Sequence, residues 1–175
     1  MTICYLTSFL GELATIATAI IAGCGLRFAK KEYKLHKQRA ESETLAKFNE
    51  RFTHDKNINE TIEELIEFDQ NQRKTDKEGN RDMKKLRQHE MFLRFYEELQ
   101  IALENKALDA EHVCYMFAYY AIQYERDLYH IYIKDDDNTW KRYHLFVQTM
   151  KRVAKENKYF PELIDDVLSN SNPKE

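Results

Sequence analysis

The pattern of hydrophobic and polar positions divides the chain into an apolar start and a long polar remainder. Residues 3–26 contain one charged side chain, Glu12, and the chain then becomes abruptly basic. A helix of this length, at about 1.5 Å per residue, can cross the roughly 30 Å hydrocarbon core of a bilayer. The pattern therefore predicts an N-terminal transmembrane helix over residues 1–27.

The polar remainder has the pattern of long helices joined by few turns. The whole chain holds only four glycines and two prolines, and three of the glycines lie at positions 11, 23 and 25. Because residues 27–52 contain neither residue type, we expect the helix to leave the membrane as a basic juxtamembrane stalk over residues 28–56.

Apolar residues at helical spacing then predict a helical bundle domain over residues 57–168, with a flexible tail over 169–175. The expected fold class is therefore all-α. The expected boundaries are an N-cap at Asn57 or Asn59, a loop over 70–80, a helix over about 82–105, a helix from an Asp109 cap to about 133, a turn at Asp135–Asp137, a helix over 140–157, and a short helix that begins at Pro161.

Charge is segregated along the chain. The net charge is −3, with +5 in residues 27–39 and −1 in residues 1–26, which leaves −7 for residues 40–175. Since basic segments beside a span stay in the cytoplasm, we expect a single-pass protein of the inner (cytoplasmic) membrane, with its N-terminus outside and its C-terminal domain cytoplasmic. The acidic body disfavours a protein that coats duplex nucleic acid.

Two other interpretations of the apolar start remain open. Residues 21–24 read Ile-Ala-Gly-Cys, as at the processing site of a lipoprotein leader, although no basic residue precedes the apolar stretch and several follow it. The stretch is also compatible with a helix buried in a soluble protein. The three cysteines have neither metal nor redox spacing, and we interpret them as reduced thiols.

Small and hydroxyl side chains form a stripe along the expected span, and Glu12 lies within it. A carboxyl group at membrane depth is costly, so it indicates either a functional role or a hydrated position near the headgroups. Copies of the helix that meet through the stripe would place their carboxyls in a ring, a feature that selects cations in channels. The candidate pore-lining residues of such a homo-oligomer in the lipid bilayer are Ser8, Glu12, Thr15 and Thr18. Helix association without conduction remains open.

Aromatic residues concentrate in the bundle, where residues 92–146 hold 13 of the chain's 22 aromatic side chains. Rings beside guanidinium groups suit a nucleotide or a short single-stranded oligonucleotide. The alternative is ordinary helix packing, in which tyrosine hydroxyls reach the surface. The candidate ligand-binding residues are Arg94, Tyr115, Tyr119 and Arg126.

No motif of catalysis or metal binding stands out. Asp127 and His130 have the i, i+3 spacing of one half of a di-iron site, but the second Glu-x-x-His is missing. Asp135–Asp137 lacks the alternation of a calcium loop. The chain has no nucleophile elbow, phosphate loop or paired zinc ligands. We expect no enzyme activity, no cofactor and no metal.

One stretch resembles a known family. Residues 92–99 read Phe-Leu-Arg-Phe-Tyr-Glu-Glu-Leu and are followed by Asp109, by the aromatic run 115–124 and by Trp140. This is similar to an uncharacterised family of small bacterial and phage-associated proteins with one N-terminal span and a helical cytosolic domain. The resemblance implies a bacterial single-pass protein and no settled activity. The architecture also resembles membrane effectors of antiviral defence systems.

These observations lead to one leading hypothesis and one alternative. The leading hypothesis is an oligomeric single-pass membrane effector whose cytosolic helical domain senses a ligand or partner and gates a cation-permeable pore. The alternative is a membrane-tethered helical scaffold that recruits a cytosolic protein partner without conducting ions.

Overall fold

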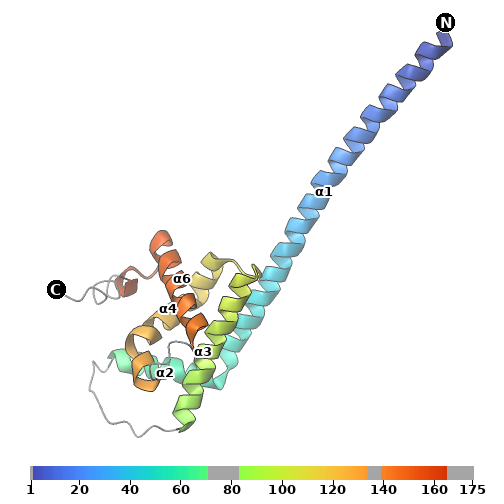
Figure 1. The fold of residues 1–175 in the computed structure, drawn as a ribbon. Coiled ribbons are helices and arrows are strands. Elements are labelled where there is room, and N and C mark those ends of the chain that lie inside the picture. The colour runs from blue at the N-terminus through green and yellow to red at the C-terminus, as the bar shows by residue number, and fades with distance from the viewer. Residues whose placement is uncertain (1, 71–82, 134–138, 165–175) are drawn as a thin grey trace. The chain divides into compact units, whose positions relative to one another are not determined.

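A computed structural model gives the fold of the chain (Figure 1). It describes the backbone of residues 2–70, 83–133 and 139–164, and the side chains of residues 22–68, 83–133 and 139–164. The residues described form helices and no strand, so the expected all-α class is confirmed. The helices are α1 (Thr2–His54), α2 (Lys56–Gln70), α3 (Met83–Glu104), α4 (Ala110–Asp127), α5 (Tyr129–Tyr132) and α6 (Lys141–Asn157).

The chain divides into two units, residues 1–42 and residues 43–175. The first unit is the greater part of α1, which continues without a break through the expected span and the expected stalk. Every side chain of residues 22–40 is exposed. The second unit takes in residues 43–54 of α1 together with the expected bundle.

The described residues do not support the transmembrane helix expected over residues 1–27. Within the described part of the chain, no helix combines the length and the apolar character that a membrane crossing requires. The exposed part of α1 is rich in lysine and arginine, and the side chains of residues 1–21 lie outside those the structure describes.

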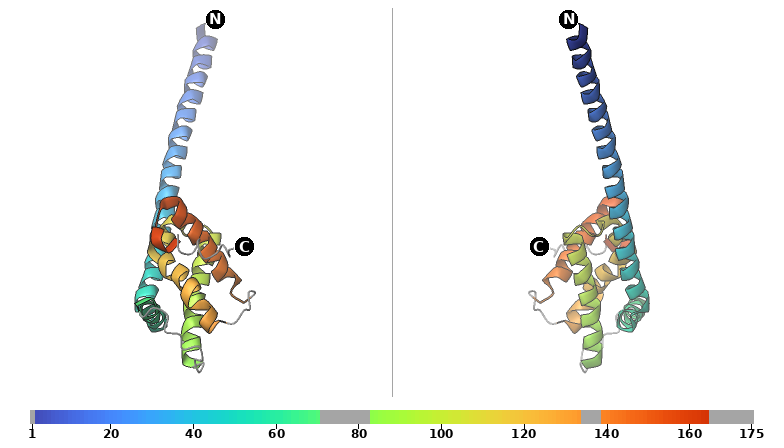
Figure 2. Two further views of the ribbon diagram at one scale, coloured as in Figure 1. Left: turned by 90° about the vertical axis from the view of Figure 1, so that its left-hand side faces the viewer. Right: turned by 90° about the vertical axis from the view of Figure 1, so that its right-hand side faces the viewer.

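The bundle is built around α4. Its buried side chains are Val113, Cys114, Phe117, Ala118, Ala121, Ile122, Gln123 and Tyr124. Helix α6 packs against both α3 and α4, and α2 packs mainly against α3 (Figure 2). Contacts with α2, α3 and α6 bury one side of α4, while Tyr115 on the same helix stays exposed.

The end of α1 belongs to this core. The Phe52 ring lies 5.5 Å from the ring of Phe95 and 5.4 Å from that of Phe117, and Phe48 meets Phe95 edge-on. Beside these rings, Arg51 forms an ion pair with Glu98 of α3. Aromatic contacts therefore anchor the last turns of α1 to α3 and α4.

Two buried tyrosines hold α3 and α6 on consecutive turns of α4. The Tyr96 hydroxyl of α3 donates to the carbonyl of Phe117 at 3.1 Å, and the Tyr143 hydroxyl of α6 donates to that of Ala121 at 2.8 Å. Burial raises the pKa of both phenols well above 10.0, so they stay neutral donors. The hydrogen bonds remove the cost of an unsatisfied polar group in the core.

Several expected boundaries are confirmed. Asp109 caps α4, since its carboxylate accepts from the backbone N–H groups of Glu111 and His112. Helices α3 and α6 lie within a residue or two of their expected limits, and residues 161–164 are helical after Pro161. The expected loop over 70–80, apart from its first residue, and the expected turn at Asp135–Asp137 lie outside the described residues.

Two boundaries were wrong. The cap of α2 is Asp55 rather than Asn57 or Asn59, because the Asp55 carboxylate accepts from the backbone N–H of Asn57 at 2.9 Å. The helix that begins after Asp109 ends at Asp127 instead of continuing to 133, and the four-residue α5 follows. At this break Leu128 is buried, and the ring of Tyr129 stacks on that of Tyr143, 5.8 Å away. These contacts accompany the change of direction between α4 and α5.

Helices α3 and α6 end on left-handed lysines. Lys106 has φ of 57° and Lys158 has φ of 58°, and in each case the next backbone N–H donates at 2.9 or 2.8 Å to a carbonyl five residues back. Glycine usually occupies this position because its lack of a Cβ removes the steric cost. A chain with so few glycines accepts that cost at both helix ends.

Replacing Lys158 by glycine should stabilise the protein, whereas the same replacement in the middle of α6 should destabilise it. We expect Lys158→Gly to raise the free energy of unfolding by about 0.5–1 kcal/mol, since glycine adopts the left-handed conformation without strain. Gln148→Gly, in the exposed middle of α6, should lower it by about 1 kcal/mol. Urea unfolding followed by circular dichroism measures both. Two changes of the same sign would contradict the strain at residue 158.

Candidate functional site

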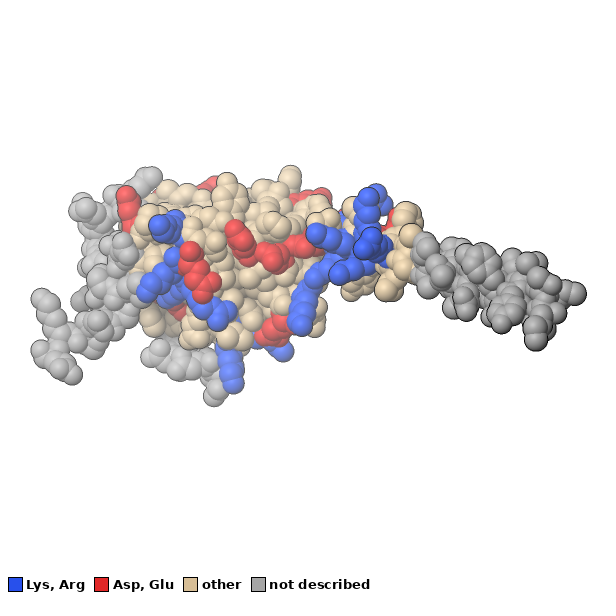
Figure 3. All heavy atoms as spheres, turned by 90° about the horizontal axis from the view of Figure 1, so that it is seen from above, with Lys and Arg blue, Asp and Glu red and all other residues tan. Residues whose placement is uncertain are grey.

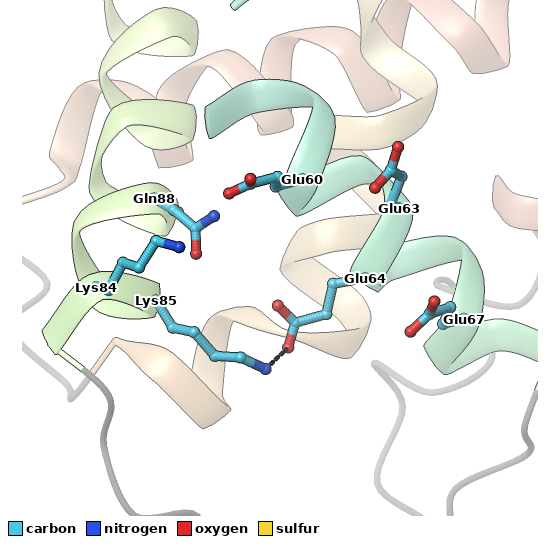
Figure 4. Close-up of a pocket in the computed structure, with 7 residues that line it drawn as sticks. All are labelled: Glu60, Glu63, Glu64, Glu67, Lys84, Lys85 and Gln88. Atoms are coloured by element: carbon cyan, nitrogen blue, oxygen red, sulfur yellow. Dashed lines mark hydrogen bonds and ion pairs between the residues drawn. The ribbon is translucent and has the colours of Figure 1, made fainter. Parts of the chain in front are cut away.

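A polar cleft of about 330 Å³ opens between α2 and α3. Figure 4 shows Glu60 and Glu64 pointing from α2 toward Lys84, Lys85 and Gln88 on α3. Four carboxylates and two ammonium groups give its lining a negative balance. The residues that line it are Glu60, Glu63, Glu64, Glu67, Lys84, Lys85 and Gln88.

The periodicity of α2 places the acidic side chains here. Ile58, Thr61 and Leu65 are buried on one side of the helix, with 0%, 1% and 0% of their surfaces exposed. The four glutamates recur at the i, i+3, i+4 and i+7 positions between these residues, a spacing that puts them on a shared side. Packing of the apolar side against the core therefore turns the acidic side toward the cleft.

Glu64 is the most strongly interacting group of the cleft. One carboxylate oxygen lies 3.4 Å from the Lys85 ammonium and also accepts from the Tyr132 hydroxyl of α5, while the other lies 3.5 Å from Nε2 of His89. Burial raises the pKa of the Glu64 carboxyl, but the side chains of His89 and Tyr132 and the charges of His89 and Lys85 outweigh it. Together they lower the pKa from 4.5 to about 2.

Behind Glu64, the packing leaves polar atoms without hydrogen bonds. His89 is 1% exposed and its ring stacks on that of Tyr132 at 3.7 Å. Its Nε2 faces Glu64, and its Nδ1 has no hydrogen-bond partner among the described residues. The hydroxyl of the neighbouring Tyr124 also lacks one in that part of the chain. Buried groups of this kind are rare in native proteins and call for an explanation such as a function or a bound water.

A second cluster of the same composition is fully bonded. The His144 ring contacts the Glu125 carboxylate at 3.2 Å through Nδ1 and the Tyr129 hydroxyl at 3.0 Å through Nε2. Lys151 donates to the other oxygen of Glu125 at 2.6 Å. Tyr129 is buried, so no substrate reaches its hydroxyl, and we interpret this cluster as a structural tie between α4, α5 and α6.

Helix α5 therefore connects the two clusters. Its first residue, Tyr129, contacts His144, and its last residue, Tyr132, donates to Glu64. The two tyrosines are separated by three positions, so both hydroxyls are held by one turn of helix. A change at Glu64 would therefore reach α5 through Tyr132, and α5 contacts α6 through Tyr129.

Of the four residues expected to bind a ligand, Tyr115 and Tyr119 lie one turn apart on α4, Arg126 lies farther along the same helix, and Arg94 lies on α3. Tyr115, 71% exposed, packs edge-on against Tyr159, and Tyr119 packs against Phe160. Arg126 donates twice to the carboxylate of its neighbour Asp127, at 2.7 and 2.6 Å. It lies seven positions after Tyr119 on α4, about 10 Å along the helix axis.

Arg94 lies on another helix, where its side chain is exposed on α3. Burial raises the pKa of the Glu97 carboxyl, and the charges of Arg142 and Arg94 oppose that shift. Arg94, Tyr115, Tyr119 and Arg126 thus each interact with a different group. Ligand binding at these four positions stays a prediction.

The four residues expected to line a pore are not placed. The side chains of Ser8, Glu12, Thr15 and Thr18 lie outside those that the structure describes, although the backbone there is part of α1. Their role stays a prediction from the sequence.

Sequence reasoning missed Glu64, His89 and Tyr132. For His89 a signal was present, because it follows Leu86 by three positions and precedes Leu93 by four, which is the spacing of the core side of a helix. A histidine on such a side is a candidate for a buried partner of a carboxylate. Nothing in the sequence indicates that its partner is Glu64, which lies on another helix.

The described residues contain no candidate metal site. Among the described residues, no three side chains of His, Cys, Asp or Glu lie close enough together to hold a metal ion. Comparisons of the chain with protein-family models, with curated proteins and with solved structures find no match. The resemblance to the phage-associated family therefore stays a prediction.

The ion pairs of Glu64 give a pH-dependent prediction. We expect Glu64→Gln to lower the free energy of unfolding at pH 7 by about 1–2 kcal/mol, a figure reduced for solvent screening of a partly exposed group. Because the pKa of Glu64 is lower in the folded protein than its ordinary 4.5, its contribution is complete above pH 4.5. It is lost as the pH falls through about 2, where wild type and variant converge.

Urea unfolding at a series of pH values measures this difference, and Glu63→Gln, on the same helix and cleft, is the matched control. The control should stay within about 0.5 kcal/mol of wild type at every pH. Equal losses for the two variants would show that Glu64 has no special electrostatic role.

Proposed function

We propose that the protein is an oligomeric single-pass membrane effector. In this proposal residues 1–27 cross the inner membrane and line a cation-permeable pore, and the cytosolic bundle senses a ligand or partner that gates it. A role in antiviral defence is part of the proposal and rests on the architecture alone.

The observation that carries the proposal is the unbroken helix α1, from Thr2 to His54. One helix contains both the apolar segment with its carboxyl, Glu12, and the aromatic turns around Phe52 that are packed into the bundle. A continuous helix transmits rotation or displacement better than a flexible linker does, since its backbone hydrogen bonds resist bending. This supports coupling between a sensing domain and a span.

The cleft beside Glu64 is the sensing site that the geometry favours. Its negative lining disfavours an anionic nucleotide and favours a small ligand, or a partner's side chain, with cationic or hydrogen-bond-donating groups. Such a ligand would compete with Lys85 and Tyr132 for the carboxylate and would thereby act on α5. The nucleotide or short oligonucleotide remains the proposal for the aromatic surface around Tyr115 and Tyr119.

The pore is tested at its carboxyl. In liposomes, we expect Glu12→Gln to reduce cation flux at least about tenfold, which corresponds to about 1.4 kcal/mol of lost cation stabilisation. Glu32→Gln, the next carboxylate along α1, is the control and should conduct as wild type does. Flux that is unchanged in Glu12→Gln would remove the ring of carboxyls from the mechanism.

One observation favours the alternative, a membrane-tethered scaffold that recruits a cytosolic partner. Tyr115, Met116 and Tyr119 of α4 are 71%, 38% and 39% exposed and lie within about one turn of the helix. Surfaces of this kind often mark protein–protein contacts. A scaffold needs such a surface, and any apolar helix of sufficient length could serve as its membrane segment.

Replacing the span separates the two functions. If residues 3–26 are exchanged for an unrelated apolar helix of equal length, a scaffold keeps its cellular activity and an effector with a pore loses it. We expect loss of activity, measured beside a Tyr115→Ala/Tyr119→Ala variant that carries the native span. Full activity of the exchanged protein, together with loss in the tyrosine variant, would favour the scaffold.

A further inference from the structure

Five of the six cations that follow the apolar segment share one side of α1. At 3.6 residues per turn they fall within an arc of about 120°, over about 15 Å of helix. We call this set the cationic stripe; it consists of Arg27, Lys30, Lys31, Lys34 and Lys37. Figure 3 shows cations gathered along the described start of α1. The sixth cation, Arg39, points about 140° away from the centre of the stripe.

The stripe is exposed, and no described side chain neutralises it. No ion pair joins any of its five side chains to a described residue, and all five are exposed. The one carboxylate within this stretch, Glu32, lies on the opposite side and contacts His36 at 3.7 Å instead. In the bundle, by contrast, Arg51, Lys85 and Lys151 each contact a carboxylate.

Apolar side chains border the stripe on both flanks. Leu26 and Tyr33 project on one flank and Phe28 and Leu35 on the other, and all four are exposed. Alternation of cations with aliphatic and aromatic side chains is the composition of helices that lie at the boundary between headgroups and hydrocarbon. An isolated stripe of lysines on a soluble helix needs no such flanks.

We propose that the cationic stripe binds the phosphate groups of anionic phospholipids. The choice of a lipid over a nucleic acid follows from the position of the stripe, directly after the apolar residues 3–26. The inference rests on the proposed function in requiring a membrane, but it does not depend on a pore. It places the stripe at the cytoplasmic leaflet, whose lipid phosphates would contact this part of α1.

The test compares the full chain in phosphatidylcholine vesicles with the full chain in vesicles that contain about 30 mol% phosphatidylglycerol. A water-soluble acetylating reagent and mass spectrometry give the reactivity of each lysine, divided by that of Lys106 to correct for orientation. We expect the stripe lysines to react at least about threefold more slowly in the anionic vesicles. Salt at about 0.5 M should restore their reactivity, because it screens exposed charges.

Two variants with the same change in net charge sharpen the test. In Lys30→Gln/Lys34→Gln the remaining stripe lysines, Lys31 and Lys37, should lose most of their protection. In Arg39→Gln/Lys47→Gln, which changes cations outside the stripe, the protection should remain.

Three results would overturn the inference. Equal reactivity in neutral and anionic vesicles would exclude lipid recognition while leaving the proposed function intact. Protection by added single-stranded RNA, with none from phosphatidylglycerol, would assign the stripe to nucleic acid. Protein that fails to float with any vesicle would contradict both the inference and the proposed membrane function.

Discussion

The bundle depends on the way buried hydroxyls are satisfied along α4. The carbonyls of Phe117 and Ala121 on α4 accept hydrogen bonds within the helix, and each accepts a second one from a tyrosine of a neighbouring helix. If either bond were lost, a hydroxyl would be buried without a partner, at a cost of about 1–3 kcal/mol. The two bonds therefore fix the register of α3 and α6 against α4, and with it the position of His89 on α3.

Polar groups in the bundle fall into two kinds because of that register. Around Glu125 both ring nitrogens of His144 and the Lys151 ammonium have a partner, and these bonds tie α4, α5 and α6 together. Around Glu64 the charges are paired, but His89 and Tyr124 keep hydrogen-bonding atoms that no described residue satisfies. A protein tolerates such atoms where something else binds or where a change of state is needed. Both clusters contain a tyrosine of α5, so a displacement of α5 at one cluster would also be felt at the other.

The helices could be predicted from the sequence because their signals are local. Scarcity of glycine and proline indicated long helices, and Asp109 was recognised as a cap because a carboxylate before an apolar run satisfies the first backbone N–H groups. The end of α4 was missed because no breaking residue marks it, and packing of Tyr129 on Tyr143 decides it instead. The Glu64 cluster was missed because Glu64 and Tyr132 are 68 positions apart and only tertiary packing joins them.

The position of Trp140 gives the bundle an optical reporter of its own. It is the single tryptophan of the chain, it forms the N-cap of α6, and it is 8% exposed. An indole in an apolar setting fluoresces at shorter wavelength than one in water, so the native emission spectrum reads out whether the start of α6 is docked. Loosening of this helix, by a ligand or by a substitution, would appear as a red shift without any dye attached to the chain.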